Sequence, residues 1–375
     1  MRREVEEIVS ELKKLSFEMG PIRPPSESTS LLLRITENCP WSRCKFCYGT
    51  FYNRGKFRVR ELNEVLHDID IIHKIVMNIK ELSKLIGGLD WLPNILNPYY
   101  LYGKGAAYLN QSEIKNYACL SNVYTWMLSG MKTVFLQDAD NLTVKTENFK
   151  VILRYLREKF PSIERISSYA RAKTAAYRKI EDLRELHREG LSRLHIGLET
   201  GDEELLRYVN KGVTVEEHIR AGRNIMETGI ELSEYVMPGL GGVKYSKQHA
   251  INTAKVLNEI NPTYIRFRRF VPKPGTPLYE EWKNGNFQLL SPHDLLIEIK
   301  QLIENLNVNS RVCFDHIVNP SIKFKGKIVP LFSQDYEGYK FPEEKDKVLE
   351  LIELGLKIDK SLWVTTEELI EMRLI

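Results

Sequence analysis

The stretch TVFLQDADNLTVKTENFKVILRYLREKFPSIERISSY, residues 133–169, holds two short apolar runs around one amphipathic segment. The runs at 133–137 and 164–169 have the length of strands, and the segment 146–159 has the apolar spacing of a helix. The same alternation continues along the chain, with further strands expected at 192–198, 230–237 and 263–270 and helices at 174–188, 202–209, 214–228 and 246–260. Strands that alternate with helices predict an α/β fold with a parallel sheet and helices outside it.

Toward the N-terminus the chain supplies one more strand. A charged amphipathic helix is expected at 3–18, and the apolar strand SLLLRIT follows at 30–36. A long helix is expected at 61–86, where apolar residues recur every three or four positions. Together with 30–36 the strands make six βα units, which predicts a partial (β/α)6 barrel of the TIM type. In such barrels the functional residues lie at the C-terminal ends of the strands.

Three regions are expected along the chain. Residues 1–29 form an N-terminal helix and linker, residues 30–280 form the barrel core, and residues 281–375 form a C-terminal extension that packs on the barrel. The core contains a helical insertion at about 87–132, which is rich in tyrosine. The extension is expected to hold an apolar run at 311–318 and helices near 292–306, 343–358 and 365–373.

Composition excludes few classes of protein. The 375 residues include 54 basic and 50 acidic side chains, for a net charge of +4, which is too balanced to indicate nucleic acid or membrane binding. The sequence has no run of 18 apolar residues, so no transmembrane helix is predicted, and the N-terminus lacks the apolar region of a signal peptide. With five cysteines and no export signal, we expect a cytoplasmic protein with reduced thiols and no membrane partner.

Three of the five cysteines are crowded into the loop after the first strand. Cys39, Cys44 and Cys47 have the spacing C-x4-C-x2-C. This pattern favours a [4Fe–4S] cluster with three protein ligands, which leaves one iron open for chemistry. Two alternatives remain from the residues alone. One is a structural zinc ion, for which His67 or Cys119 would be the fourth ligand, and the other is a set of buried free cysteines.

The cysteine loop resembles that of the radical S-adenosylmethionine (SAM) enzymes. The resemblance rests on a strand, then the Cys-x-Phe-Cys half of the motif ending at Cys47, then βα units with Gly-x-Glu ending at Glu199. It runs from about residue 30 to 280 and is strongest toward the branch of coproporphyrinogen oxidase, tRNA methylthiotransferase and Elongator-type enzymes. The usual superfamily spacing is C-x3-C-x2-C, so this chain has one extra residue between Cys39 and Cys44. With this spacing the chain resembles a subfamily apart from these named enzymes.

The resemblance implies a cofactor pair and a mechanism. SAM would bind the open iron, and one electron from the reduced cluster would cleave it to a 5′-deoxyadenosyl radical that abstracts hydrogen from an unknown substrate. A low-potential electron donor of the flavodoxin or ferredoxin type is the implied partner. The cysteine ligands are Cys39, Cys44 and Cys47, and Phe46 is the aromatic side chain expected near the SAM adenine.

Residues at the later strand ends are implied as SAM contacts. Gln137 and Asp138 stand where the family binds the SAM amino group, largely through backbone carbonyls, although the family's glycines and glutamate are missing here. Ser168 and Arg171 follow the next strand, and Arg171 either pairs with the SAM carboxylate or is a solvated arginine. Glu199 resembles the polar residue that hydrogen-bonds SAM; its alternative is a surface glutamate beside a helix N-terminus.

One glycine-rich stretch and the substrate complete the predicted site. Gly239, in the stretch after the fifth strand, is implied to approach the adenosine. The substrate stays open: the resemblance allows a tRNA- or tetrapyrrole-modifying enzyme, and a non-catalytic zinc-binding barrel is the alternative of another class. RNA is a possible partner through the basic residues Arg266, Arg268 and Arg269, which instead bind an anionic small molecule if they point inward.

Overall fold

The computed structural model describes residues 2–47 and 55–372 of the chain. The chain divides into two compact units. The first unit comprises residues 2–37, 58–168 and 188–192, and the second comprises the other described residues. Each unit is described separately below.

The first unit contains three of the predicted strands and the helical insertion. β1 (Leu31–Arg34), β4 (Thr133–Gln137) and the beginning of β5 (Arg165–Ala170) pair in parallel, with Leu31 opposite Val134 and Thr133 opposite Arg165. The remaining elements are α1 (Arg2–Leu12), η1 (Pro25–Glu27), β2 (Thr36–Glu37), β3 (Arg58–Val59), α2 (Leu62–Ile86), η2 (Leu89–Asn94), α3 (Pro98–Tyr102), η3 (Ala106–Tyr108), α4 (Gln111–Leu128), η4 (Asn141–Thr143) and α5 (Thr146–Lys159). The insertion is therefore helical, as the sequence predicts.

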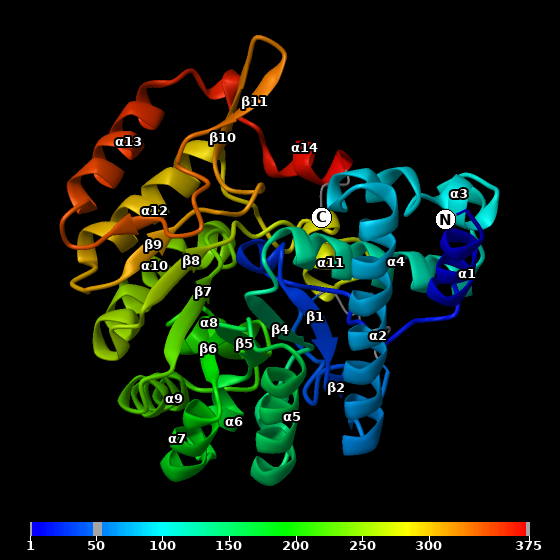
Figure 1. Ribbon diagram of the computed structural model, residues 1–375. Helices are drawn as coiled ribbons and strands as arrows, with labels where there is room; N and C mark the ends of the chain where they lie inside the picture. Colours follow the sequence, from blue (N-terminus) through cyan, green and yellow to red (C-terminus); the bar gives the residue numbers. More distant parts are fainter. Residues whose placement is uncertain (1, 48–54, 373–375) are drawn as a thin grey trace. The chain divides into compact units, whose positions relative to one another are not determined.

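The helix α2 is the longest in the first unit and packs against α1, α4 and α5 (Figure 1). Its buried face repeats the predicted apolar spacing, because Val65, Ile69, Ile72 and Ile79 are all completely or almost completely shielded from solvent. Its ends are set by local chemistry. A capping box between Glu61 and Glu64 starts the helix, and a glycine in the left-handed region ends it at residue 87.

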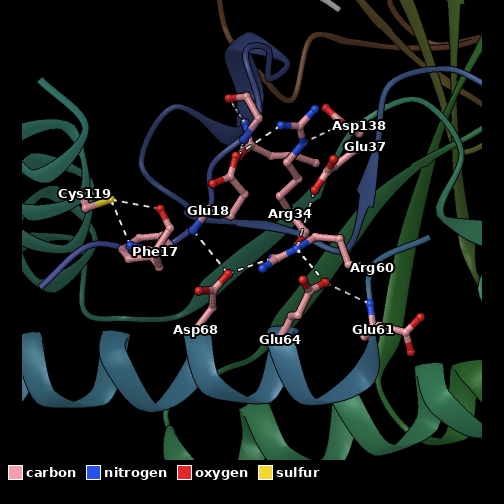
Figure 2. A network of polar contacts seen from close by, with 12 residues as sticks. Phe17, Glu18, Arg34, Glu37, Arg60, Glu61, Glu64, Asp68, Cys119 and Asp138 are labelled. Carbon is pink, nitrogen blue, oxygen red and sulfur yellow. Dashed lines mark hydrogen bonds and ion pairs between the residues drawn. The ribbon is translucent and has the colours of Figure 1, made fainter. Parts of the chain in front are cut away.

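The N-terminal helix is shorter than predicted. α1 ends at Leu12, whereas the charge pattern predicts a helix to residue 18. The chain leaves the helix because its backbone is used in a tertiary contact. The amide of Phe17 donates to Cys119 Sγ at 3.4 Å, and the Phe17 carbonyl accepts from the same thiol at 3.3 Å (Figure 2). Amphipathic spacing does not reveal such a contact, so the helix boundary predicted from it was wrong.

The second unit carries the later strands. β6 (Leu191–Glu199), β7 (Glu231–Val236), β8 (Tyr264–Phe267) and β9 (Arg311–Cys313) are parallel neighbours in that order, and β12 (Tyr339–Lys340) pairs antiparallel with β9. The helices that follow the strands are α6 (Ala172–Tyr177), α7 (Ile180–Arg188), α8 (Glu203–Tyr208), α9 (Val215–Glu227), α10 (Gly242–Ile260), α11 (Pro277–Lys283) and α12 (Pro292–Asn305). Each of β1, β4, β5, β6, β7 and β8 leads into a helix, so the predicted α/β fold of six βα units is confirmed.

The C-terminal extension adds elements that alternation alone does not predict. The expected helices are present as α12, α13 (Lys345–Lys357) and α14 (Thr366–Glu371), and the apolar run at 311–318 begins with β9. α12 packs against α10 on one side and α13 on the other (Figure 1). A separate antiparallel hairpin is formed by β10 (Ser321–Phe324) and β11 (Lys327–Pro330), and η5 (Lys360–Leu362) follows α13. None of the described helices is long and apolar enough to cross a membrane.

Candidate functional site

The cysteine segment lies in the second unit, and neighbouring loops hold its backbone. The amide of Lys45 donates to the carbonyl of Val209 at 2.9 Å, and the amide of Leu278 donates to the carbonyl of Lys45 at 3.1 Å. The indole of Trp41 donates to the carbonyl of Asn210 at 2.7 Å. These bonds tie the segment to the α8–α9 loop and to the start of α11, so its position is fixed by residues more than 150 positions away in the sequence.

One glycine in the α8–α9 loop makes this docking possible. Gly212 has a φ of +69°, and a Cβ added there would lie 2.3 Å from the Trp41 ring. Both the left-handed backbone and the lack of space require glycine at this position. The turn around Gly212 therefore belongs to the site, although no motif in the sequence marks it.

The three thiols are half-buried, and two of them pack against an apolar cluster. Phe46 is 8% exposed and packs with Leu205, Val209, Met237 and other buried side chains, and Cys44 and Cys47 contact the same cluster. Burial, together with the neighbouring Cys44 and Cys39, raises the pKa of the Cys47 thiol to about 12. Burial also raises the pKa of Cys44. Such thiols lose their protons only when a metal binds them.

The donor geometry suits separate irons better than one metal ion. Within residues 2–47 and 55–372, no three His, Cys, Asp or Glu side chains converge closely enough to hold a single ion. A structural zinc site needs four donors within about 2.0–2.3 Å of one point. In a [4Fe–4S] cluster the cysteine thiolates are spread over the whole cluster, so its ligands stand farther apart. Cys39 and Cys44 still lie close enough to Cys47 to raise the pKa of its thiol.

Lys211 connects the cysteine segment to the end of β6. Its ammonium pairs with Glu199 at 2.9 Å and lies 5.5 Å from the centre of the Phe46 ring. Its carbonyl lies 4.0 Å from Cys44 Sγ. Burial disfavours the charge of Lys211, but Glu199 and Cys44 outweigh burial, so the pKa of Lys211 is raised. Lys211 is thus a fixed positive charge beside the thiols, and sequence reasoning missed it.

Glu199 owes its position to an irregularity at the end of β6. The pairing of β6 with β7 shifts register between Gly197 and Glu199, and Glu199 has a φ of +62°. A Cβ added at Gly197 would lie 2.1 Å from Glu199 Oε1, so the glycine lets the carboxylate fold back over the strand. The Gly-x-Glu pattern of the sequence therefore has a direct physical meaning, which is that the glycine makes room for the glutamate.

Arg171 joins the same group of side chains. It precedes α6, donates to the Lys211 carbonyl at 3.0 Å, and lies 5.6 Å from the centre of the Trp41 ring. Its charge lowers the pKa of Cys44, although burial of that thiol raises it more. The structure therefore brings Arg171, Glu199, Phe46 and the cysteines together around Lys211.

Gly239 lies in the loop after β7, whose residues Met237 and Leu240 belong to the same apolar cluster as Phe46. Its φ is +85°, and its amide donates to Glu298 Oε1 at 2.7 Å. The predicted adenosine contact is thus in a backbone conformation that favours glycine. It also has a buried partner, Glu298, that sequence reasoning missed.

Three predicted site residues belong to the first unit and have local partners. The side-chain oxygen of Gln137 accepts from the Gly20 amide at 2.8 Å, and its side-chain nitrogen donates to the carbonyls of Gly20 and Ile22 at 3.0 Å. Asp138, with a φ of +72°, pairs with Arg34 at 2.6 Å (Figure 2). The Ser168 hydroxyl accepts from the Asn141 amide at 2.9 Å. These side chains therefore hold the ends of β1, β4 and β5.

Two of the three arginines on and after β8 are buried. Arg266 is completely buried and pairs with Asp315 at 2.6 Å. Arg269 is 3% exposed and donates to the Val364 carbonyl at 3.0 Å and to the Thr366 hydroxyl at 2.6 Å. Both side chains stabilise the C-terminal extension. They are therefore not an exposed RNA-binding patch, contrary to one interpretation of the sequence.

Comparisons with known proteins agree with the predicted superfamily. The sequence model described as the Radical SAM superfamily matches residues 130–254. The tRNA uridine(34) acetyltransferase of Methanocaldococcus jannaschii is 26% identical over 29% of this chain and 20% of its own length. The Elongator complex protein 3 of Schizosaccharomyces pombe is 22% identical over 67% of this chain and 38% of its own length. This chain therefore spans only about a fifth to two fifths of these two relatives.

Solved structures include similar chains at low identity. The coproporphyrinogen III oxidase of Escherichia coli is 16% identical, with a TM-score of 0.45, over 80% of this chain and 54% of that chain.

Proposed function

We propose that this chain, which belongs to the radical SAM superfamily, holds a [4Fe–4S] cluster on Cys39, Cys44 and Cys47 and uses it to initiate radical chemistry on a substrate. When bound, the cluster supplies the electron that cleaves SAM to methionine and a 5′-deoxyadenosyl radical, which takes a hydrogen atom from that substrate. The observation that carries the proposal is the position of the three thiols beside Lys211, Arg171 and Glu199. The family match begins after the cysteine segment, so this geometry is an independent argument.

The chain's own charges suit the proposed ligands. Three thiolates bring three negative charges into a half-buried place, and Lys211 and Arg171 offset part of them. The guanidinium of Arg171 also matches a carboxylate with two hydrogen bonds, which supports its role toward the SAM carboxylate. The Lys211 ammonium holds the Glu199 carboxylate at the strand end, where its remaining lone pairs can accept hydrogen bonds from SAM hydroxyl or ammonium groups.

The other predicted contacts enter the proposal with narrower roles. Phe46 forms an apolar wall for the adenine, and Gly239 allows the backbone to approach the adenosine. For Gln137, Asp138 and Ser168 we propose backbone contacts only, since their side chains bind neighbouring segments. The core that performs this function is residues 30–280, flanked by the N-terminal linker and the C-terminal extension.

The proposed chemistry also requires an electron donor and a reducing compartment. A cluster that must be reduced before it cleaves SAM needs a low-potential donor, which we propose is a flavodoxin or ferredoxin type of protein. The reduced thiols that ligate it are maintained in the cytoplasm, which is the compartment we propose.

The direct test is spectroscopic. Anaerobically reconstituted protein should bind about four irons per chain, absorb near about 400 nm, and give an electron paramagnetic resonance signal after dithionite that changes when SAM is added. Alanine at Cys39, Cys44 or Cys47 should abolish the signal. Alanine at Cys119, which is buried in the first unit and bonds Phe17, is the matched control and should retain it. A colourless wild-type sample that holds zinc would overturn the proposal.

We infer that RNA is the second candidate for substrate, and one surface favours it. The hairpin of β10 and β11 exposes Phe324 (53%), with Lys327 directly opposite it in register. Lys325 lies 5.3 Å from the centre of the Phe324 ring. Among the described residues, no acidic side chain pairs with Lys325 or Lys327. An exposed aromatic ring between unpaired lysines is suited to stacking a base and neutralising its phosphates.

The RNA candidate has its own test. Binding of a labelled, unmodified tRNA transcript is measured by fluorescence anisotropy for wild type, Phe324→Ala and the pair Lys325→Ala, Lys327→Ala. Loss of one stacked base should weaken binding by roughly 5-fold or more, and the lysine pair should flatten its salt dependence. Alanine at Lys74 and Lys80, two exposed lysines of α2, is the matched control. Equal binding by all variants would refute this role for the hairpin.

A further inference from the structure

The loop that follows β7 has a specific shape. Leu240 donates to the carbonyl of Met237 at 3.1 Å, and Gly242 donates to the carbonyl of Gly239 at 3.0 Å, so two tight turns overlap. Gly239 and Gly242 both have positive φ. A backbone of this kind has several alternatives of similar energy because glycine populates both signs of φ. Something outside the loop must select this conformation.

The helix α12 contacts the loop at the point where its two turns meet. Glu298 accepts the Gly239 amide at 2.7 Å and is 1% exposed. Leu295, one turn earlier on the same face of α12, would lie 3.4 Å from a Cβ added at Gly239. Next to the loop, the amide of Val243 donates to the carbonyl of Gln288 at 3.0 Å. The extension thus holds the loop through one buried carboxyl group and by close packing.

Stability alone does not explain a carboxyl group at this position. Burial raises the pKa of Glu298 to about 7, although the Ser246 hydroxyl and the Gly239 amide favour the charged form. In the described part of the chain, no Lys or Arg pairs with Glu298. The Nε2 of His249 is 3.7 Å from the Glu298 carboxyl group, and burial lowers the pKa of that imidazole to about 4. A buried carboxyl group without a cationic partner is costly, and an apolar side chain would pack there at lower cost.

Through His249, the buried polar groups around Glu298 also connect to the end of β6. His249 Nδ1 lies 2.8 Å from the hydroxyl of Thr200, the residue that follows Glu199. Thr253, one turn further along α10, accepts the Gly201 amide at 2.8 Å. One set of buried polar groups therefore runs from α12 through α10 to the two strand ends that carry Gly239 and Glu199.

We propose that Glu298 is a positioning residue for SAM: it holds the Gly239 loop in the conformation that accepts the adenosine. The inference rests on the proposed function. It adds that the C-terminal extension, which lies outside the core of 30–280, sets the affinity of the chain for SAM. Glu298 itself does not touch the reacting atoms, and it acts through the amide of Gly239.

The test compares variants of similar size. Glu298→Met fills the same space without an acceptor, whereas Glu298→Gln keeps an oxygen for the Gly239 amide. SAM is titrated into anaerobically reconstituted protein, with iron content measured on each sample. We expect Glu298→Met to raise the Kd for SAM about 5-fold or more, because the Gly239 amide loses its acceptor. We expect the Kd of Glu298→Gln to stay within about 2-fold of the wild-type value. Glu298→Leu repeats the comparison if the methionine variant is not recovered.

A control on the same helix separates positioning from general damage. Leu302→Ala removes buried apolar volume one turn beyond Glu298 and leaves the Gly239 amide with its acceptor. It should lower Tm and leave the Kd for SAM unchanged. If Leu302→Ala weakens SAM binding as much as Glu298→Met does, or if Glu298→Met binds SAM as wild type does, the positioning role is refuted.

A second readout does not depend on SAM. Hydrogen exchange of the peptide spanning 237–242, measured on wild type and variants without SAM, should be faster in Glu298→Met and unchanged in Glu298→Gln. If hydrogen exchange in Glu298→Met equals that of wild type, Glu298 does not hold the loop, and the proposal is refuted even if activity falls. If the wild type does not bind SAM but the variants show the expected differences in hydrogen exchange, the proposed function is refuted. Glu298 would then hold the loop for structural reasons only.

Discussion

Replacing Lys211 with methionine tests the charge arrangement around the cysteines. Methionine keeps the length and apolar stem of lysine but leaves Glu199 without the ammonium that pairs with it at 2.9 Å. The two side chains are only 15% and 13% exposed, so the carboxylate stays largely out of water when its partner is lost. Breaking such a pair from one side costs about 3 kcal/mol.

The expected shift in Tm follows from the size of the protein. At about 2.1 cal/mol/K per residue, the entropy of unfolding of a chain this long is roughly 0.8 kcal/mol/K, so a loss of about 3 kcal/mol lowers Tm by about 4 °C. Thermal unfolding is followed by circular dichroism with chelator present, so that every sample has the same metal content. The double variant Lys211→Met, Glu199→Gln should regain about half of the loss or more, because it leaves no unpaired charge.

An exposed ion pair provides the control. Lys300 and Glu353, on α12 and α13, are 32% and 48% exposed, so Lys300→Met should cost less than about 1 kcal/mol. The reasoning is refuted if Lys211→Met unfolds within about 1 °C of wild type. It is also refuted if the stability loss of the double variant equals the sum of the losses of the two single variants at Lys211 and Glu199.

Three further predictions concern stability, the site and the strand ends. Glu234 is fully buried and its pKa is raised to about 8, mainly by burial, so the folded protein keeps a proton that the unfolded chain has lost above about pH 4.5. Stability should therefore fall by up to about 5 kcal/mol as pH rises from 4.5 to 8, and Glu234→Gln, followed by urea unfolding at several pH values, should flatten that slope. Gly212→Ala should displace Trp41 and reduce the iron bound per chain by more than half, measured by iron assay after reconstitution; full iron content would contradict the docking described for the cysteine segment. Gln137→Ala leaves the Gly20 amide and two carbonyls without partners and should cost about 2 kcal/mol in urea unfolding, whereas a loss below about 0.5 kcal/mol would show that water replaces the side chain.

The fold could be predicted largely from the sequence because its signals are local. The run 133–137 matches β4 residue for residue, and the predicted helix at 146–159 is α5. Apolar period and length determine such elements without reference to the rest of the chain. Predictions were less complete where tertiary contacts set the boundary or the pairing. Phe17 leaves the helix to meet Cys119, and β12 reaches β9 as an antiparallel edge that no βα alternation indicates.

The site shows the same division between local and distant signals. Cysteine spacing identified the segment that carries the thiols, and Gly-x-Glu located Glu199. Lys211 and Glu298 were missed because nothing near them in the sequence marks them: each is significant only through a partner that the fold brings to it, Glu199 for one and the Gly239 amide for the other. For the arginines 266, 268 and 269 the sequence left two interpretations open, an RNA-binding surface or inward-pointing side chains. Arg266 and Arg269 are buried and bond internal partners, which favours the second interpretation for these two.

The central claim is that the three cysteines support reductive cleavage of SAM, and one measurement tests it most directly. Anaerobically reconstituted protein is mixed with SAM and dithionite, and 5′-deoxyadenosine is quantified by chromatography over time. We predict accumulation of 5′-deoxyadenosine in wild type and in Cys119→Ala, and none in Cys39→Ala, Cys44→Ala or Cys47→Ala. A wild-type protein with a full complement of iron and sulfide that forms no 5′-deoxyadenosine would contradict the account.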